Sequence, residues 1–551
     1  MNTPRRFSVA LLVAFAALLL PVPTIGPASG SGLTLGLVPG FGLGSRLEAQ
    51  ETILIRNGRV MDGSGNPWIY ADILVRGDRI AAMGDLEGVQ ADQVIDASGL
   101  YVTPGFIDTH SHAGAGLATP GLSHARPLLA QGLTTIFANP DGGGPVDLAA
   151  QRAALLKDGL GVNVAPFVPH GSVRRAVLGT ESRDPTPEEM QRMRDLVRAG
   201  MEEGAWGMSS GTFYVPGAYS KPEEIEDLAK VVAEYDGAYQ SHYRDESTYT
   251  VGVIAAVDEV INVGRTAGIP VVLTHVKALG PFVWGYGAAI VSRVERARAE
   301  GIQVFADQYP YTASSTSLEA ALLPRWSQAG GRDSLMARMS RPEAMKRIRE
   351  AMVEGLARRG GAARIQFRRY VPDPSIEGRL LSDLARERGQ DPIDVAVDLI
   401  QGGSVSIVSF NMSEKDVETL MAQPWTMTSS DGALVPWGVG VPHPRSYGAF
   451  PRKIRLYARE KGVVTLEDAI RSMTSLPAMV YGLEDRGTLR EGAAADIVIF
   501  DLEKVNDPAT YTRPHQLAEG MVWVLVNGTP AIADGEFTDS RSGRVLLKGR
   551  E

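Results

Sequence analysis

Hydrophobic runs of strand length alternate with amphipathic stretches of helix length through the middle of the chain. Eight such runs occur, at residues 105–108, 134–138, 162–168, 206–209, 238–241, 270–274, 303–306 and 425–428. Helix-like stretches lie between most of them, among them 147–160, 187–203, 222–235 and 251–267. Strands that alternate with helices in this number predict an α/β fold, a (β/α)8 barrel over residues 105–480.

The interval between the seventh and eighth runs is too long for a single connection within a barrel. It contains helix-like stretches of its own, at residues 342–359 and 382–388. We therefore predict an inserted segment from about residue 324 to residue 403.

Both ends of the chain beyond this region show short alternating runs separated by Gly, Asp and Asn turns. These runs lie at residues 52–56, 71–75, 79–83, 93–95, 496–500, 522–527 and 544–547. Two β-rich ends that flank an α/β middle predict one small β-sandwich, formed jointly by residues 50–104 and 481–551.

The first 49 residues have the layout of a secretory signal peptide. Arg5 and Arg6 precede an apolar run from Val9 to Leu20, which is shorter than a membrane-spanning helix. A run of Leu, Glu and Ala directly before Gln50 fits a cleavage site. The segment predicts export to the periplasm or the exterior, with no stable membrane span after cleavage; a retained N-terminal anchor is the alternative.

Composition and charge narrow the chemistry. The chain has 551 residues, a formal net charge of -9 and no cysteine. Nucleic acid requires a basic surface, so the expected partner is a small polar molecule. Without cysteine there are no disulfides and no thiolate ligands, so a metal site must use nitrogen and oxygen ligands. The oligomeric state is left open.

Four of the 8 histidines fall just beyond predicted strands. His110 and His112 follow the first strand, His242 follows the fifth and His275 follows the sixth. The C-terminal ends of barrel strands meet at one mouth, so these side chains are expected to converge. Alternation along an extended backbone places His110 and His112 on the same side, where they can share an ion. The pattern predicts a metal site.

The stretch from Pro104 to His112, PGFIDTHSH, resembles the first-strand signature of the amidohydrolase superfamily. Further runs resemble the N-acyl-D-amino-acid deacylase (D-aminoacylase) family in particular: GTFYVPGAY (211–219), SHYRDE (241–246), THVK (274–277), YPYTASST (309–316), FNMSEKDV (410–417), SDG (430–432) and HPRSYGAFPR (443–452). They occur in the family's order. The resemblance implies zinc-dependent hydrolysis of the linear amide bond of N-acyl-D-amino acids, which releases a carboxylate and a free amino acid.

One position departs from the family's pattern. The family has a metal-binding cysteine after the second strand, where this chain has Asp141 in the run ANPDG. A carboxylate can also bind zinc and can bridge two ions. The resemblance therefore implies that Asp141 is a metal ligand and leaves open whether one or two zinc ions bind; the alternative is that Asp141 is only a turn residue.

Asp431, after the eighth strand, matches the family's acid/base aspartate. Amide hydrolysis requires a metal to acidify a water molecule and polarise the carbonyl group. It also requires a carboxylate to take the proton from the water and deliver it to the leaving amine. The resemblance implies that Asp431 is this catalytic group.

Candidate substrate-binding residues surround the same mouth. Lys277 follows the sixth strand closely enough to pair with a substrate carboxylate. Tyr214, Tyr309 and Ser315 match substrate-contacting positions of the family, and a tyrosine hydroxyl is suited to donate to the carbonyl oxygen. Further candidates, as residues that support the metal ligands, are His170 and Arg445.

Two other classes of function stay open. Cyclic-amide hydrolases such as hydantoinases and dihydroorotases share the barrel, but they carry a carboxylated lysine after the fourth strand, and residues 207–212 contain no lysine. A dipeptidase is a further hydrolytic alternative. An exported metal-binding or ligand-binding protein without activity belongs to a different class, and the intact histidines and Asp431 argue against it.

Overall fold

In the computed structural model, which describes residues 51–549, eight parallel strand positions form the centre of the chain. They are β8 (Phe106–Asp108), β9 (Leu133–Ala138), β10 (Asn163–Pro166) with its continuation β11 (Val168–Pro169), β12 (Gly207–Gly211), β13 (Ala238–His242), β14 (Val271–Leu273), β15 (Val304–Gln308) and β19 (Thr426–Thr428). Each lies within two residues of a run that the sequence predicted, because buried parallel strands are apolar on both faces.

Backbone hydrogen bonds join these strands into a closed ring. At Phe167, between β10 and β11, the amide of Phe167 donates to Ala138 O (3.2 Å) and that of Trp206 donates to Pro166 O (3.0 Å). Beyond β8 and β19, Asp431 N donates to His110 O at 2.9 Å. The (β/α)8 barrel is therefore confirmed, and its last seam ties together two of the candidate site residues.

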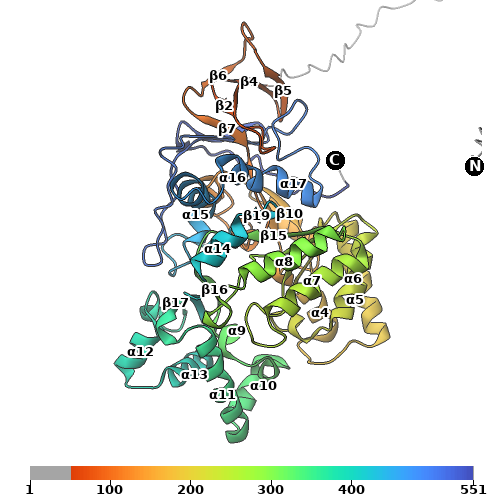
Figure 1. Ribbon diagram of the computed structural model, residues 1–551, viewed down its shortest axis with the longest axis vertical. Coiled ribbons are helices and arrows are strands. Elements are labelled where there is room, and N and C mark those ends of the chain that lie inside the picture. Colours follow the sequence, from red (N-terminus) through yellow and green to blue (C-terminus); the bar gives the residue numbers. More distant parts are fainter. Residues whose placement is uncertain (1–50, 550–551) are drawn as a thin grey trace, which may run out of the picture. The chain divides into compact units, whose positions relative to one another are not determined.

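The outer layer consists of helices that follow the strands. Successive helices α5, α6, α7 and α8 contact one another and lie side by side in Figure 1. The helices around the barrel are α1 (Gly114–Leu117), α2 (Arg126–Leu129), α3 (Leu148–Leu156), α4 (His170–Leu178), α5 (Pro187–Glu202), α6 (Pro222–Ala233), α7 (Val253–Ala267), α8 (Gly287–Ala299), α14 (Glu414–Met421), α15 (Arg445–Arg452), α16 (Leu466–Met473) and α17 (Ser475–Tyr481). α5 begins with a capping box between Thr186 and Glu189 and buries Met193 and Val197 against the barrel.

The two ends of the described chain meet in two stacked sheets. One has the order β5-β4-β1-β6 and the other β23-β22-β21-β20-β7-β2-β3. Their strands are β1 (Thr52–Arg56), β2 (Arg59–Val60), β3 (Ile69–Tyr70), β4 (Asp72–Arg76), β5 (Arg79–Gly84), β6 (Gln93–Asp96), β7 (Tyr101–Pro104), β20 (Ile497–Phe500), β21 (Met521–Val526), β22 (Thr529–Ala533) and β23 (Glu536–Phe537). Ile55, Val75, Ile499 and Leu525 belong to the buried core between the sheets. The small β-sandwich thus combines residues far apart in sequence (Figure 1).

The predicted strand at residues 544–547 is wrong. This segment forms only an isolated bridge between Val545 and Val164, with Leu546 N donating to Val164 O at 2.8 Å. Leu546 O in turn accepts from the indole nitrogen of Trp206 at 2.9 Å. The alternating pattern of the segment reflects packing against β10 of the barrel, rather than a place in the sandwich.

The segment between β15 and β19 folds on a sheet of its own, which we call the insertion (residues 314–409). Its antiparallel strands have the order β16-β18-β17, and its elements are β16 (Ser314–Ser317), α9 (Leu318–Leu322), α10 (Gly331–Met339), α11 (Pro342–Arg358), β17 (Ile365–Arg369), α12 (Leu381–Arg388), α13 (Pro392–Gly402) and β18 (Ser406–Ser409). It is wider than the predicted 324–403, because β16 consists of Ser and Thr and has no hydrophobic run. Figure 1 shows β16 and β17 at the barrel side of this subdomain.

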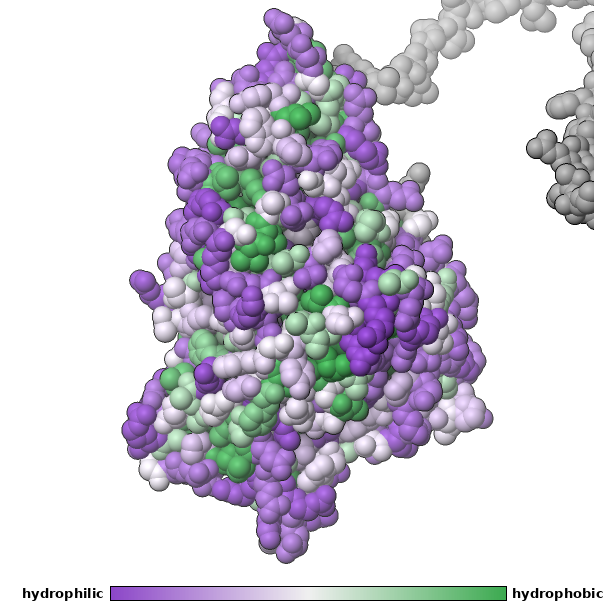
Figure 2. All heavy atoms as spheres, viewed as in Figure 1, coloured by the Kyte–Doolittle hydropathy of each residue, from purple (hydrophilic) through white to green (hydrophobic). Residues whose placement is uncertain are grey.

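Within residues 51–549, none of the helices combines the length and hydrophobicity that a membrane crossing requires. On the face seen in Figure 2, hydrophilic residues predominate and hydrophobic residues form small separate groups. The predicted signal segment, residues 1–49, lies outside the described residues.

Candidate metal centre and active site

The four predicted histidines converge at the C-terminal ends of the barrel strands. His110 and His112 follow β8, His242 ends β13, and His275 lies two residues after β14. The rings of His110 and His275 are 4.8 Å apart between centroids, and those of His242 and His275 are 4.4 Å apart. His112 is the most exposed of the four and lines the cavity.

Asp141 lies at the centre of this group. Its Oδ1 is 3.3 Å from His110 Nε2, 3.5 Å from His275 Nε2 and 3.7 Å from His242 Nδ1. Its Oδ2 is 3.4 Å from His112 Nε2. One carboxylate therefore faces all four rings. It is shared by two sets of possible metal ligands, one with His110, His112 and Asp431 and one with His242 and His275.

Three residues of the site have an unusual backbone conformation. Asp141, His275 and Asp431 all have positive φ, at 55°, 37° and 47°. Residues other than glycine rarely adopt this conformation, and it is found where surrounding structure holds functional groups in place. For His275 the support is visible, because its amide donates to Asp307 Oδ1 at 2.8 Å.

Several polar atoms of the group are buried without a hydrogen bond. They include both ring nitrogens of His110, both ring nitrogens of His242, and Asp141 Oδ1. Buried polar groups are nearly always paired, so such a cluster of unpaired nitrogen and oxygen donors calls for another ligand. Imidazole nitrogens and carboxylate oxygens are the donors that zinc takes in proteins without thiolates. The residues fit a zinc centre.

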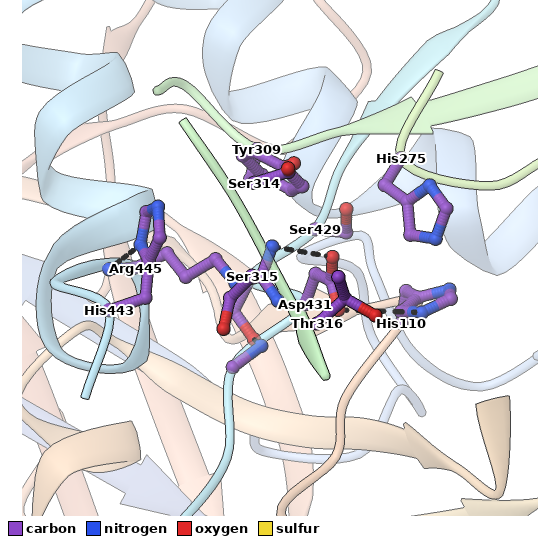
Figure 3. A network of polar contacts seen from close by, with 12 residues as sticks. His110, His275, Tyr309, Ser314, Ser315, Thr316, Ser429, Asp431, His443 and Arg445 are labelled. Atoms are coloured by element: carbon purple, nitrogen blue, oxygen red, sulfur yellow. Dashed lines mark hydrogen bonds and ion pairs between the residues drawn. The ribbon is translucent and has the colours of Figure 1, made fainter. Parts of the chain in front are cut away.

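Asp431 joins the edge of this centre. Its Oδ1 is 3.2 Å from His112 Nε2, and its Oδ2 forms an ion pair with Arg445 NH1 at 2.6 Å. Figure 3 shows Asp431 between Arg445 and His110, with all three side chains directed toward the same space. Burial alone would raise the pKa of Asp431, but the Arg445 guanidinium and the histidines hold it well below its usual range. Asp431 is therefore ionised.

A model of the amidohydrolase family, Amidohydro_3, matches residues 93–532. The chain belongs to the amidohydrolase family. It is 35% identical to the D-aminoacylase of Alcaligenes xylosoxydans xylosoxydans over 90% of this chain and 97% of that protein.

Two solved structures resemble this amidohydrolase closely. The N-acyl-D-glutamate deacylase of Bordetella bronchiseptica, in complex with zinc and a phosphonate that mimics the tetrahedral intermediate, has a TM-score of 0.77 and 34% identity over 91% of this chain and all of its own. A D-aminoacylase with a binuclear metal centre has a TM-score of 0.77 and 32% identity over 90% of this chain and 99% of its own. The resemblance noted in the sequence is confirmed.

One carboxylate of this amidohydrolase was missed in the sequence. Glu246 is buried, with Oε1 2.5 Å from Lys277 Nζ and 3.3 Å from His275 Nδ1, and Oε2 3.6 Å from His242 Nε2. Burial raises the pKa of Glu246, but Lys277 and the two histidines lower it overall. It lies beside two of the possible metal ligands, His242 and His275, and is placed to orient their rings. Its position four residues after His242, within the run SHYRDE, was the available signal.

The predicted binding residues line one cavity of about 500 Å³ above the metal centre. Tyr214 donates to or accepts from Thr316 Oγ1 at 3.2 Å, and burial keeps its pKa well above the usual value. The Tyr309 ring lies 4.7 Å from the Arg445 guanidinium. Ser315, whose hydroxyl donates to Ile407 O at 3.0 Å, enters from β16. Their substrate contacts stay predictions.

Two of the predicted site residues, Lys277 and His170, form hydrogen bonds with buried glutamates of the chain. Lys277 lines the cavity, but its ammonium group is bonded to Glu246 and lies 2.7 Å from His275 Nδ1. His170, at the start of α4, is bonded through Nε2 to Glu224 Oε1 at 2.9 Å, and Arg174 pairs with the same carboxylate. His170 is not part of either set of possible metal ligands.

Replacing Glu246 by glutamine is expected to lower zinc affinity by roughly 10–100-fold, the usual cost of losing a group that orients metal ligands. Zinc titration against a chromogenic chelator measures this. Glu224→Gln is the matched control, because Glu224 is also buried and bonded to a histidine but lies outside the centre. Equal losses in both variants would refute the role of Glu246.

Proposed function

We propose that this protein hydrolyses the amide bond of N-acyl-D-amino acids with zinc. The observation that carries the proposal is Asp141 facing four imidazole rings, with an ionised Asp431 at their edge. The relatives named above, D-aminoacylase and N-acyl-D-glutamate deacylase, act on such substrates and support it. Preference for the D configuration rests on these relatives alone.

The zinc ligands in this proposal are His110, His112, Asp141, His242 and His275. Zinc held there supplies polarisation of the scissile carbonyl and acidification of the attacking water. The shared position of Asp141 suits a carboxylate that bridges two ions. A centre of one or two ions is compatible with these donors.

Asp431 acts as general base and then as general acid. Arg445 holds Oδ2, so Oδ1, which faces His112, is the atom that takes the proton from water. The same proton then passes to the amine nitrogen as the carbon–nitrogen bond breaks, because an unprotonated amine leaves poorly. Water adds to the carbonyl carbon, and the products are a carboxylate and a free amino acid.

Tyr214 is placed to donate a hydrogen bond to the oxygen of the carbonyl group. Its ring centroid lies 4.7 Å from that of His242, and its raised pKa keeps the hydroxyl protonated. A neutral hydroxyl donor stabilises the negative charge that develops on this oxygen. In the proposal Tyr309 and Ser315, which line the same cavity, contact the rest of the substrate.

The experiment for the proposed function is hydrolysis of a panel of N-acetyl D- and L-amino acids and dipeptides by the purified protein. Turnover of N-acetyl-D-amino acids is expected, with loss of activity after chelation and recovery on adding zinc. Chelator-insensitive turnover would overturn the metal mechanism. Exclusive turnover of L-substrates would overturn only the stereochemistry.

We also propose that the protein is exported and cleaved before Gln50. The support is the arrangement of Arg5, Arg6 and the apolar run that ends at Leu20. Expression of the full chain in a Gram-negative host should give a periplasmic product whose N-terminal sequence starts near Gln50. A product in the cytoplasm with an intact N-terminus would reject export.

A further inference from the structure

A second cavity, of about 420 Å³, lies apart from the metal centre, and we call it the lysine pocket. Its walls come from the turn between α14 and β19, from η7 (Lys453–Glu460) with the turn after it, and from α16. It shares no lining residue with the cavity above the metal centre. A volume of this size is within the range of pockets that bind small molecules.

A buried lysine lines this pocket. Lys453 is only 2% exposed, and its ammonium group forms no ion pair with a carboxylate of residues 51–549. Its Nζ donates to Thr428 Oγ1 at 3.0 Å and to Ser472 Oγ at 2.8 Å. An ammonium group has three N–H donors, so one of them has no partner within the described residues. A buried cation with a free donor at a cavity wall calls for an anionic ligand.

The other charged residues of the pocket do not neutralise Lys453. They are Asp468 and Arg471. Asp468 is exposed, and its carboxylate accepts from the Thr465 hydroxyl at 2.9 Å, whereas Arg471 donates to Pro424 O at 2.9 Å. Burial lowers the pKa of Lys453 to about 7, although Asp468 acts in the opposite direction from beyond ion-pair distance. The positive charge of Lys453 therefore lacks a counter-charge in contact with it.

The backbone at Lys453 is also unusual. η7 is a π-helix that continues directly from α15 and begins at Lys453. π-Helical turns are rare and frequently occur at functional sites. α16 contacts both η7 and β19, so the pocket lies where this wide helix packs against the eighth strand of the barrel.

Apolar side chains form another part of the wall, and they indicate what kind of anion fits. Met421, Val463 and Val464 line the pocket together with Lys453. Met421 is buried and the two valines are half-buried. A molecule with a carboxylate at one end and a short hydrocarbon chain at the other would match both the buried cation and the apolar surface.

We propose that the lysine pocket binds a small aliphatic carboxylate, whose charged end pairs with Lys453 and whose chain lies against Met421, Val463 and Val464. The carboxylate accepts the free N–H of the ammonium group and supplies the missing counter-charge. The chain removes apolar surface of the valines from water. This ligand class follows from the lining residues and does not depend on the proposed function.

The test is a titration of the zinc-loaded protein, labelled with ¹³C at the methionine methyl groups, with hexanoate and with hexanamide as its uncharged counterpart. The signal of Met421 reports on the lysine pocket. That of Met412, whose sulfur accepts from the Tyr309 hydroxyl at 3.6 Å, reports on the active-site cavity. Met421→Leu and Met412→Leu assign the two signals.

Hexanoate should shift the Met421 signal with a dissociation constant of roughly 1 mM or lower, within reach of so small a ligand. Hexanamide should bind roughly 10-fold or more weakly, because it cannot pair with the charge of Lys453. No shift of Met421 at about 10 mM hexanoate, or equal affinity for both compounds, overturns the proposal. So does a shift of Met412 alone, because hexanoate then enters only the active-site cavity.

Lys453→Met should weaken hexanoate binding at Met421 by roughly 10-fold or more, since it removes the charge and keeps most of the side-chain volume. Lys461→Met is the matched control, because Lys461 pairs with Glu414 and Glu418 and does not line the pocket. Unchanged affinity in Lys453→Met would refute the assignment. Zinc content and the remaining methionine signals show whether each variant is folded, and the comparison of hexanoate with hexanamide decides the question in the native protein even where a variant is not.

Discussion

Replacing Asp431 by asparagine is expected to lower kcat for N-acyl-D-amino acid hydrolysis by roughly 10²–10⁴-fold, the range for losing general acid–base catalysis. Asparagine keeps the shape of the side chain but cannot take a proton from water. KM should change less than kcat, because the proton transfer is made in the transition state. Steady-state kinetics with N-acetyl-D-amino acids measure both constants.

The variant also removes a buried ion pair with Arg445, and this effect must be separated from the chemical one. Asp507→Asn is a suitable control, because Asp507 is buried and pairs with Arg452 at 3.0 Å and with Arg455, away from the cavity. Both variants lose a carboxylate–guanidinium pair, but only Asp431→Asn should lose activity at full zinc content. Full activity in Asp431→Asn would exclude Asp431 as the acid/base.

The barrel could be predicted because its strands and its sequence obey the same rule. Each central strand is covered on both faces, so β14 appears in sequence as a continuous apolar run and β9 as a buried run that is interrupted only by two threonines. Eight such runs that alternate with helices predict a barrel, and in a barrel the C-terminal ends of all the strands meet on one side. This is why the sequence alone predicts that His110, His242 and His275 lie at one end of the barrel.

Two elements that do not follow this rule were not predicted correctly from the sequence. β16 consists of Ser314 to Ser317, whose partner is β18 of the insertion, and polar residues at a subdomain edge have no hydrophobic pattern. Residues 544–547 have an alternating pattern, but alternation alone does not say which sheet a strand will join. Both errors concern segments whose structure depends on pairing with residues far away in the sequence.

Side-chain partners within the site were the least predictable feature. Lys277 was expected to be free for the substrate, but Glu246, a residue from the loop after the neighbouring strand, binds its ammonium group. His170 follows the third strand as the other histidines follow theirs, yet it begins α4, and its ring turns to Glu224. Position along the chain indicates which end of the barrel a residue occupies, whereas the direction of its side chain depends on loops whose sequence has no period.

The position of Asp141 after the second strand could be predicted from the sequence. Its location at the centre of the four histidine rings could not. The resemblance to deacylases placed it after the second strand, where that family has cysteine. Only the structure shows one of its oxygens facing three rings while the other faces His112. Two potential ion positions therefore depend on a single side chain.

Replacing Asp141 by alanine is accordingly expected to weaken zinc binding by more than about 100-fold, since even residues that only orient ligands contribute about 10–100-fold. Elemental analysis after dialysis should show the zinc content falling, whether the native protein holds one ion or two. Asp147→Ala is a control on the same side of the barrel, because Asp147 caps α3 through Ala150 N and contacts none of the site. Unchanged zinc content in Asp141→Ala would mean that Asp141 is only a turn residue.

The variant Asp141→Cys tests whether the carboxylate of Asp141 sets the metal preference of the site. A thiolate offers a single soft donor atom, whereas the two oxygens of Asp141 face different rings. The cysteine variant should therefore bind zinc at the expense of harder ions such as manganese, and the native protein should accept both more evenly. Competition between zinc and manganese, followed by elemental analysis, measures the ratio, and an identical ratio in the two proteins would show that the oxygen ligand does not set metal preference.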